Sequence, residues 1–262
     1  MAAGKAFAGV PVELSSEKVS QGSVLFVRVF DKTAKSVKIK ETTYPLFESK
    51  DGVSKGVLIG VPVRWNSGER YSVEVDEKTT GKAVEVEEKS RKLEILTIEK
   101  SKLVSNEETA KQGKVLLAAI SSLKIEKLWN GNFLKPVEGM ITTEYGTRRT
   151  VNGNKGGVHR GVDIGAEEGT AVKAANNGII AISRKHILTG NTIVLNHGAG
   201  LVSVYYHMSE LTAKENQKIK KGEVIGKVGS TGVSTGAHLH WGIWIFGVDV
   251  DPFELIKKEI DF

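Results

Sequence analysis

Two histidines separated by a single residue, in the HLH of residues 238–240, constrain the fold of this part of the chain more than any other feature. On a β-strand, residues i and i+2 project to the same face. A strand here would therefore direct His238 and His240 into one space. Two of the other four histidines also stand in short motifs, His159 in HRGVD and His207 in YYHMS. We expect β-strands to gather these side chains into one site.

The residue types of these motifs indicate a metal centre. His159 and Asp163 of HRGVD supply a nitrogen and an oxygen ligand, and one histidine of HLH can bind beside the other. Two imidazoles and a carboxylate, with a fourth position left to water, form a common catalytic zinc set. Each motif alone is more often structural than metal-binding. Their occurrence together predicts a hydrolase site.

The segment from Val158 to Pro252 resembles the lysostaphin/LytM-type zinc endopeptidases, which cut peptide bridges in bacterial peptidoglycan. The matching stretches occur in family order, which makes the resemblance more specific than any single motif. They are VHRGVDIGA at 158–166, NGIIAI at 177–182, GNTIVLNHGAGLVSVYYHMSEL at 190–211 and KKGEVIGKVGSTGVSTGAHLHWGIW at 220–244.

The resemblance implies a role for each of five residues. It assigns His159, Asp163 and His240 as ligands of Zn²⁺, and His207 and His238 as catalytic histidines. Hydrolysis would use a metal-activated water, with His238 as the better candidate for the base and His207 for the oxyanion or leaving amine. These two roles are interchangeable at this stage. The alternative is a catalytically silent domain that binds cell wall or regulates another hydrolase, but all five positions are retained, which favours the enzyme.

Residues 1–100 predict a separate β-sandwich module. Short β-branched runs alternate with turn-forming residues at near-regular spacing, which is typical of an immunoglobulin-like sandwich. The runs are 24–29, 36–40, 56–63, 70–75, 83–87 and 92–98. This region has no histidine, so we expect no metal site in it. We expect it to position or restrain the catalytic domain, or only to act as a spacer.

Residues 101–132 predict one helix and a linker. The helix should run from about Asn106 to Ser121, with a capping box at Ser105 and Glu108. Its packed face should contain Val115, Leu116, Ala119 and Ile120. A lysostaphin-type β domain should follow at 133–262, so the chain as a whole is predicted to be mostly β. The C-terminal FELIKKEI is compatible with a helix or a strand.

Composition limits the remaining function classes. A hydrophobic content of 40% and a charged content of 26% are typical of a soluble globular protein, and no apolar run is long enough to span a membrane. A cell-wall enzyme must be exported, so we expect a leader to have been removed and a periplasmic or extracellular location at the cell envelope. The net charge of +6 suits an anionic envelope or solubility alone. We expect a peptidoglycan peptide as partner, and no nucleic acid.

Several other residues allow two interpretations. His197 should hydrogen-bond loop backbone, and His186 should be a solvated loop residue. Tyr145 and Arg148 could contact substrate or be structural, and Asn191 could line the groove or cap its turn. The glycine-rich segments 229–232 and 234–236 lack a Walker lysine and are interpreted as turns at the groove rim. The lack of a recognisable wall-binding repeat and the small β module favour D-amino-acid cross-links over glycine bridges.

Overall fold

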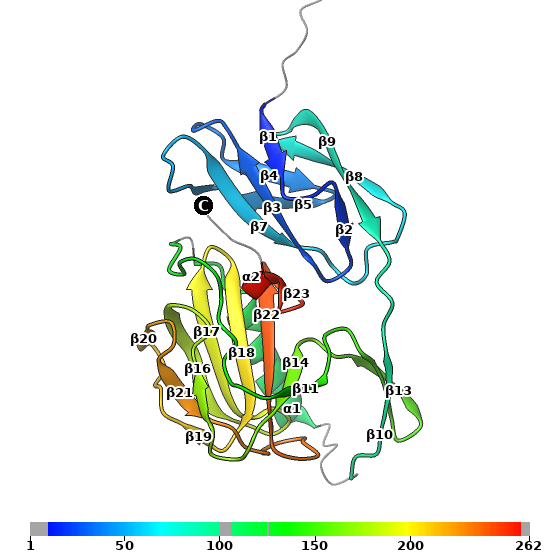
Figure 1. Cartoon of the computed structure of the whole chain (residues 1–262), viewed down its shortest axis with the longest axis vertical. Coiled ribbons are helices and arrows are strands. Elements are labelled where there is room, and N and C mark those ends of the chain that lie inside the picture. Colours follow the sequence, from blue (N-terminus) through cyan, green and yellow to red (C-terminus); the bar gives the residue numbers. More distant parts are fainter. Residues whose placement is uncertain (1–9, 100–105, 125, 258–262) are drawn as a thin grey trace, which may run out of the picture. The chain divides into compact units, whose positions relative to one another are not determined.

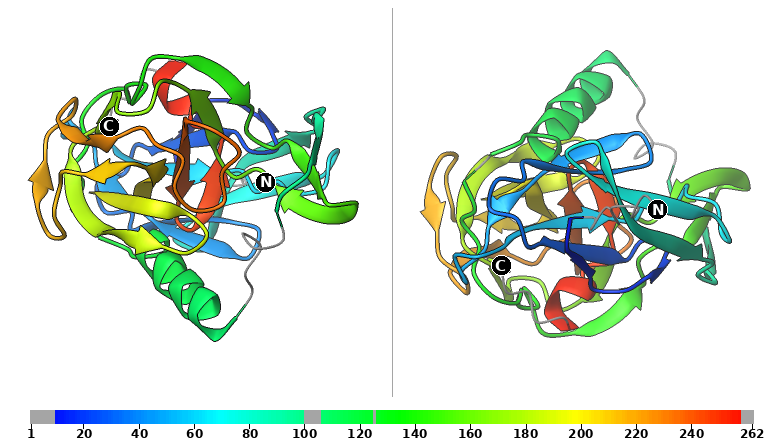
Figure 2. Two further views of the ribbon diagram at one scale, coloured as in Figure 1. Left: turned by 90° about the horizontal axis from the view of Figure 1, so that it is seen from below. Right: turned by 90° about the horizontal axis from the view of Figure 1, so that it is seen from above.

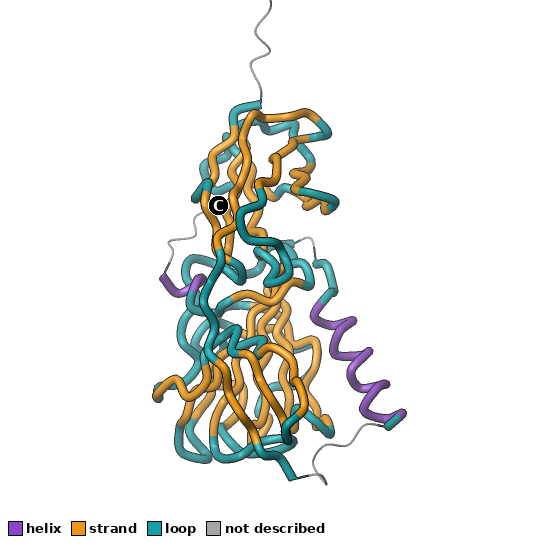
Figure 3. Tube along the Cα trace, turned by 90° about the vertical axis from the view of Figure 1, so that its right-hand side faces the viewer, coloured by secondary structure: helices purple, strands orange, loops and turns teal. Residues whose placement is uncertain are grey.

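The computed structural model describes residues 10–99, 106–124 and 126–257. They form two compact units, which meet in sequence between Lys89 and Ser90. Strands predominate in both units, and α1 (Glu107–Ile120) is the long helix of the second (Figure 3). The prediction of a mostly β protein is confirmed. The predicted domain limits of 1–100, 101–132 and 133–262 stay predictions.

The first unit consists of two sheets, with strand orders β1-β3-β7-β6 and β2-β9-β8-β4-β5 (Figure 1). Its strands are β1 (Val12–Leu14), β2 (Lys18–Ser20), β3 (Val24–Val29), β4 (Ser36–Ile39), β5 (Thr42–Pro45), β6 (Phe47–Glu48), β7 (Lys55–Gly60), β8 (Arg70–Val75) and β9 (Lys78–Glu87). In β8, Tyr71, Val73 and Val75 are buried and alternate with more exposed residues, as expected for a strand with one face on a core. The immunoglobulin-like assignment stays a prediction.

The second unit is built on one large antiparallel sheet with the strand order β11-β14-β22-β18-β17-β16-β20, to which β23 adds beside β22. Two three-stranded sheets, β10-β12-β13 and β15-β21-β19, accompany it. The strands are β10 (Leu93–Leu96), β11 (Met140–Thr143), β12 (Arg148–Val151), β13 (Asn154–Val158), β14 (Val162–Gly165), β15 (Ala171–Lys173), β16 (Gly178–His186), β17 (Gly190–Gly198), β18 (Leu201–Met208), β19 (Glu210–Leu211), β20 (Lys218–Ile219), β21 (Val224–Lys227), β22 (His238–Ile245) and β23 (Val248–Val250).

The register of three neighbouring strands positions the candidate site. Asp163 of β14 and Tyr206 of β18 both lie opposite His240 of β22. Residues opposite each other in a sheet project to the same face, so these side chains share one space. β18 is buried along its whole length, which means that both faces of the sheet are covered here.

Helix α1 covers part of this same sheet face. Ile120 is buried in a cluster with Val204, Tyr206 and Trp244, and Leu116 and Ala119 pack against it; Figure 2 shows the helix beside the sheet strands. The predicted helix span is confirmed to within a residue at each end. Val115 is 41% exposed, so its assignment to the packed face was wrong.

The capping box of α1 also differs from the prediction. Asn106 is the N-cap: its side chain accepts from the backbone of Thr109, and the Thr109 hydroxyl accepts from the backbone of Asn106. The threonine hydroxyl thus performs the role predicted for Glu108, one residue further along the helix. Ser105 lies outside the described residues.

The segment before α1 belongs to the second unit. Strand β10 pairs in parallel with β12, with Glu94 opposite Arg149. At the other end of the chain, α2 (Glu254–Lys257) follows Phe253 within FELIKKEI, and residues 258–260 of that motif lie outside the described residues. Within the described part of the chain, no helix is both long and apolar enough to span a membrane.

Candidate metal centre

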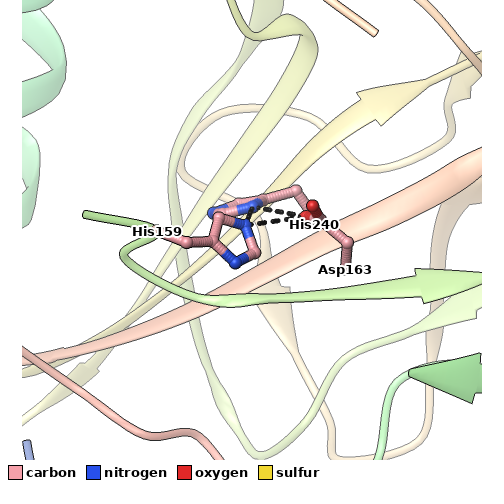
Figure 4. Close-up of side chains that lie close together, drawn as sticks. All are labelled: His159, Asp163 and His240. Atoms are coloured by element: carbon pink, nitrogen blue, oxygen red, sulfur yellow. Dashed lines mark hydrogen bonds and ion pairs between the residues drawn. The ribbon is translucent and has the colours of Figure 1, made fainter. Parts of the chain in front are cut away.

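Three predicted ligands converge on one point of the large sheet (Figure 4). Asp163 Oδ1 lies 2.9 Å from His159 Nε2 and 2.8 Å from His240 Nδ1, and the two ring nitrogens are 2.9 Å apart. All three residues are buried. Gly161 allows this convergence, because a Cβ there would lie 2.7 Å from His240 Nε2. The three residues could together hold a metal ion.

The protonation of the cluster fits a cation. His159 Nδ1 lies 3.1 Å from the carbonyl oxygen of Glu144, to which it can only donate, so a neutral His159 presents a lone pair at Nε2. Burial alone raises the pKa of Asp163, but the close approach of His159 and His240 outweighs burial and holds the pKa well below its usual range. Burial lowers the pKa of His240, against the opposing effect of Asp163. Neutral imidazoles and a carboxylate are the protonation states that bind zinc.

A second pair of charged residues holds the other oxygen of Asp163. Arg149 Nη2 donates to Asp163 Oδ2 at 3.0 Å, and Arg149 Nε donates to Glu94 Oε2 at 2.9 Å. The carboxylate of Asp163 is therefore fixed on both sides, by imidazoles at Oδ1 and by a guanidinium at Oδ2.

The two predicted catalytic histidines lie beside the cluster. His207 and His238 have ring centroids 4.9 Å apart, and His238 Nε2 lies 3.8 Å from Asp163 Oδ1. Nδ1 of His207 is 2.8 Å from the carbonyl oxygen of Thr231, and Nδ1 of His238 is 2.8 Å from that of Gly236. In each neutral ring Nδ1 therefore carries the proton, and Nε2 carries the lone pair.

His207 faces the site because the backbone of β18 departs from regular strand geometry. Side chains alternate along a strand, yet both Tyr206 and His207 approach His240: the Tyr206 ring stacks on it at 5.0 Å, and the His207 ring lies 6.3 Å away. His207 has φ = +65°, in the left-handed region, which redirects its side chain. Such a conformation costs about 1–3 kcal/mol for a non-glycine residue and tends to occur at functional sites. Burial lowers the pKa of His207 to about 3, with a further contribution from His240.

These residues open on a cavity of about 330 Å³. Its lining includes Glu94, Leu96 and Ile98, in and just after β10, and residues 233–237. Of the two glycine-rich segments predicted at the groove rim, 234–236 lines the cavity and 229–232 does not. A cavity of this size with a few convergent polar groups is typical of a small substrate site.

Other residues singled out in the sequence lie outside the cavity lining. Tyr145 is buried, and its hydroxyl bonds to the carboxylate of Asp249 at 2.9 Å. Asn191 donates to the backbone of Ser209 at 3.0 Å. His197 is buried and bonds to the carbonyl oxygen of Asn177 at 2.6 Å, which confirms its predicted backbone contact. His186 is buried at the end of β16, so its prediction as a solvated residue was wrong.

Sequence reasoning missed two residues of the site, Arg149 and Glu94. It selected Arg148, the neighbour of Arg149, and Arg148 does not line the cavity. Alternation along β12 could have distinguished the two arginines, since only one of them can share a face with the cavity. No comparable signal marked Glu94, which reaches the site through pairing between distant segments.

Comparison with known proteins identifies a family for part of the chain. Residues 157–252 match the sequence model of Peptidase family M23. Over 95 residues the chain is 40% identical to the DD-carboxypeptidase/endopeptidase Mpg of Neisseria meningitidis serogroup B, and over 96 residues it is 34% identical to the peptidoglycan DD-endopeptidase ShyA of Vibrio cholerae. These matches cover 36% and 37% of the chain but only 22% of each relative.

A solved structure resembles nearly the whole fold. The crystal structure of a candidate peptidase M23 from Pseudomonas aeruginosa has a TM-score of 0.70 and covers 90% of this chain and 94% of its own. Sequence identity is 22%, so this likeness concerns the fold alone. The predicted lysostaphin-type catalytic fold is confirmed.

Proposed function

The chain carries a Peptidase family M23 domain, and from this premise we propose that it is a zinc-dependent endopeptidase that hydrolyses peptide cross-links of bacterial peptidoglycan. The observation that carries the proposal is the convergence of His159, Asp163 and His240 at 2.8–2.9 Å, beside two further histidines and an open cavity. These three residues would hold the ion. When bound, zinc supplies Lewis acidity toward a carbonyl oxygen and lowers the pKa of a water ligand.

His207 and His238 would handle the protons of the reaction. Their Nδ1 protons are held by the backbone carbonyls of Thr231 and Gly236, so Nε2 of each ring is a proton acceptor. We assign the general base to His238, whose Nε2 lies 3.8 Å from the ligand carboxylate. His207 must first take up a proton before it can donate to the oxyanion or to the leaving amine. Exchange of the two roles would leave the chemistry the same.

The substrate class rests on the relatives. Both named relatives carry DD-endopeptidase or DD-carboxypeptidase/endopeptidase in their names, which supports a cross-link between D-configured centres as the bond that is cut. The proposal implies a location at the cell envelope, in the periplasm or outside the cell. The net charge of +6 would favour association with an anionic wall.

Digestion of defined muropeptides tests the proposal directly. Cross-linked dimers with a D,D bond and dimers with a glycine bridge are incubated with zinc-loaded protein, and the fragments are identified by mass spectrometry. We expect monomers from the D,D-linked dimer and their absence after chelation of the metal. Intact dimers together with tight wall binding would instead support the catalytically silent domain.

A further inference from the structure

Strand β10 lies outside the family match at 157–252 but contributes a charged side chain to the metal centre. We propose that Glu94 is a positioning residue of this centre, which sets its metal affinity by acting through Arg149. This inference rests on the proposed zinc site. Glu94 lies in a segment that precedes residues 133–262, the predicted bounds of the catalytic domain.

The contacts form one continuous chain from Glu94 to the ligands. Glu94 Oε2 accepts from Arg149 Nε at 2.9 Å, and Glu94 Oε1 accepts from the Thr143 hydroxyl at 3.2 Å. Arg149 Nη2 then donates to Asp163 Oδ2 at 3.0 Å, which leaves Oδ1 directed at the two imidazoles. Hydrogen bonds of this kind orient metal ligands, and their loss typically weakens metal binding by 10–100-fold.

Backbone pairing holds Glu94 in this position. Arg149 lies opposite Glu94 in the parallel β10–β12 pair. Beyond the strand, the side chain of Asn152 accepts from the Ile98 amide at 2.9 Å and donates to the Ile98 carbonyl at 2.8 Å. The segment is therefore fixed at the strand and beyond it, and Glu94 is presented to Arg149 by a rigid element.

Charge gives Glu94 a second effect on the metal. The guanidinium of Arg149 orients Asp163, but its positive charge also repels a divalent cation bound to that carboxylate. Glu94 offsets this charge, and the side chains of Glu94 and Arg149 are only 28% and 26% exposed, so water screens the pair incompletely. Without the Glu94 carboxylate, Arg149 would be less firmly oriented and its charge uncompensated. Both changes weaken metal binding.

The test measures zinc affinity in the full-length chain by competition with a chromophoric chelator, without an activity assay. We expect Glu94→Gln, which keeps the side-chain shape, to raise the zinc dissociation constant by about 10-fold or more. Glu99→Gln makes the same chemical change at an exposed position five residues along the segment, and it should stay within about 2-fold of the parent. Thermal unfolding of the metal-free proteins controls for folding.

A double-mutant cycle with Arg149→Gln separates positioning through Arg149 from a general structural effect. In the Arg149→Gln background, Glu94→Gln should change zinc affinity by less than about 3-fold. An equal loss in both backgrounds would overturn the role of Arg149, and equal affinities for Glu94→Gln and Glu99→Gln would overturn the inference itself. A parent chain that binds no zinc would instead refute the proposed function.

Discussion

Two groups of buried polar residues, each containing histidine, lie at the large sheet of the second unit. They differ in how the polar side-chain atoms are paired. In the first, around His197, Nδ1 lies 2.6 Å from the Asn177 carbonyl oxygen and Nε2 lies 2.7 Å from Ser203 Oγ. Ser203 in turn pairs with the Tyr205 hydroxyl at 2.9 Å, which accepts from the Ala175 amide. Every polar side-chain atom of this cluster has a protein partner.

The second cluster, His159 with Asp163 and His240, directs acceptors at one another. The carboxylate oxygen and the Nε2 lone pair of neutral His159 approach within 2.9 Å, and two acceptors at this distance repel unless a cation or a proton lies between them. This cluster also borders the cavity. Burial of histidine therefore does not distinguish a metal centre from a structural network. The direction of the hydrogen bonds, from donor to acceptor, distinguishes them.

The largest expected difference between the clusters is in metal content. His240→Ala should abolish stoichiometric zinc, because His159 and Asp163 alone hold the ion poorly, whereas His197→Ala should retain about one zinc per folded chain. Elemental analysis after dialysis measures both. Zinc retained by His240→Ala, or lost in folded His197→Ala, would contradict the distinction drawn between the clusters.

Turnover rates should distinguish the two histidines proposed to be catalytic from the residues proposed to bind the metal. His207→Ala and His238→Ala should each lower the rate on cross-linked muropeptides by roughly 100-fold or more, the usual effect of losing an acid–base or oxyanion group, while zinc content stays near normal. Rates and metal content are measured on the same preparations. Loss of zinc in His238→Ala with retention in His240→Ala would mean that the two HLH histidines have exchanged roles.

Sequence patterns predicted the parts of the molecule that depend on local periodicity. The β-branched runs at 24–29 and 70–75 coincide with β3 and β8. The spacing of HLH places His238 and His240 on one face of β22, as a strand requires. Both results follow from alternation, a property of the strand itself.

The remaining features depend on departures from periodicity or on pairing between distant segments. Alternation would place Tyr206 and His207 on opposite faces, and only the left-handed backbone at His207 brings both to His240. Glu94 reaches the site through a parallel pairing with a segment 55 residues away in sequence, which composition does not encode. A truncation near Phe133, the predicted start of the catalytic domain, would remove both Glu94 and α1. A test of restraint by the first unit should therefore start the shortened chain near Ser90.

The first cluster, around His197 and called the closed cluster because every polar side-chain atom in it has a protein partner, should make the stability of the protein depend on pH. Burial lowers the pKa of His197 from 6.5 to about 4, so between these values the unfolded chain binds a proton that the folded chain does not. The contribution of neutral His197 to the free energy of unfolding is complete above about pH 6.5 and is lost as the pH falls toward 4. Between pH 7 and pH 4.5 the loss should be about 2–3 kcal/mol. Urea unfolding of His197→Gln should show a weaker pH dependence by this amount, and equal dependence in both proteins would argue against a neutral, buried His197.

The smallest expected effect contrasts two serines, each beside a histidine nitrogen. Ser203 Oγ lies 2.7 Å from His197 Nε2 in the closed cluster, and Ser234 Oγ lies 3.3 Å from His238 Nδ1 at the cavity. Ser203→Ala should lower the free energy of unfolding by about 1–2 kcal/mol, because it leaves a buried imidazole nitrogen without its partner, and it should leave turnover unchanged.

Ser234→Ala is the matched change at the open site. It should alter turnover more than stability, because His238 keeps its bond to the Gly236 carbonyl but loses a second contact that fixes the ring. Urea unfolding and muropeptide digestion on both variants give the four values needed. A fall in turnover for Ser203→Ala at unchanged stability would show that the two clusters are coupled through the sheet, and the separation between a structural and a catalytic histidine network would then fail.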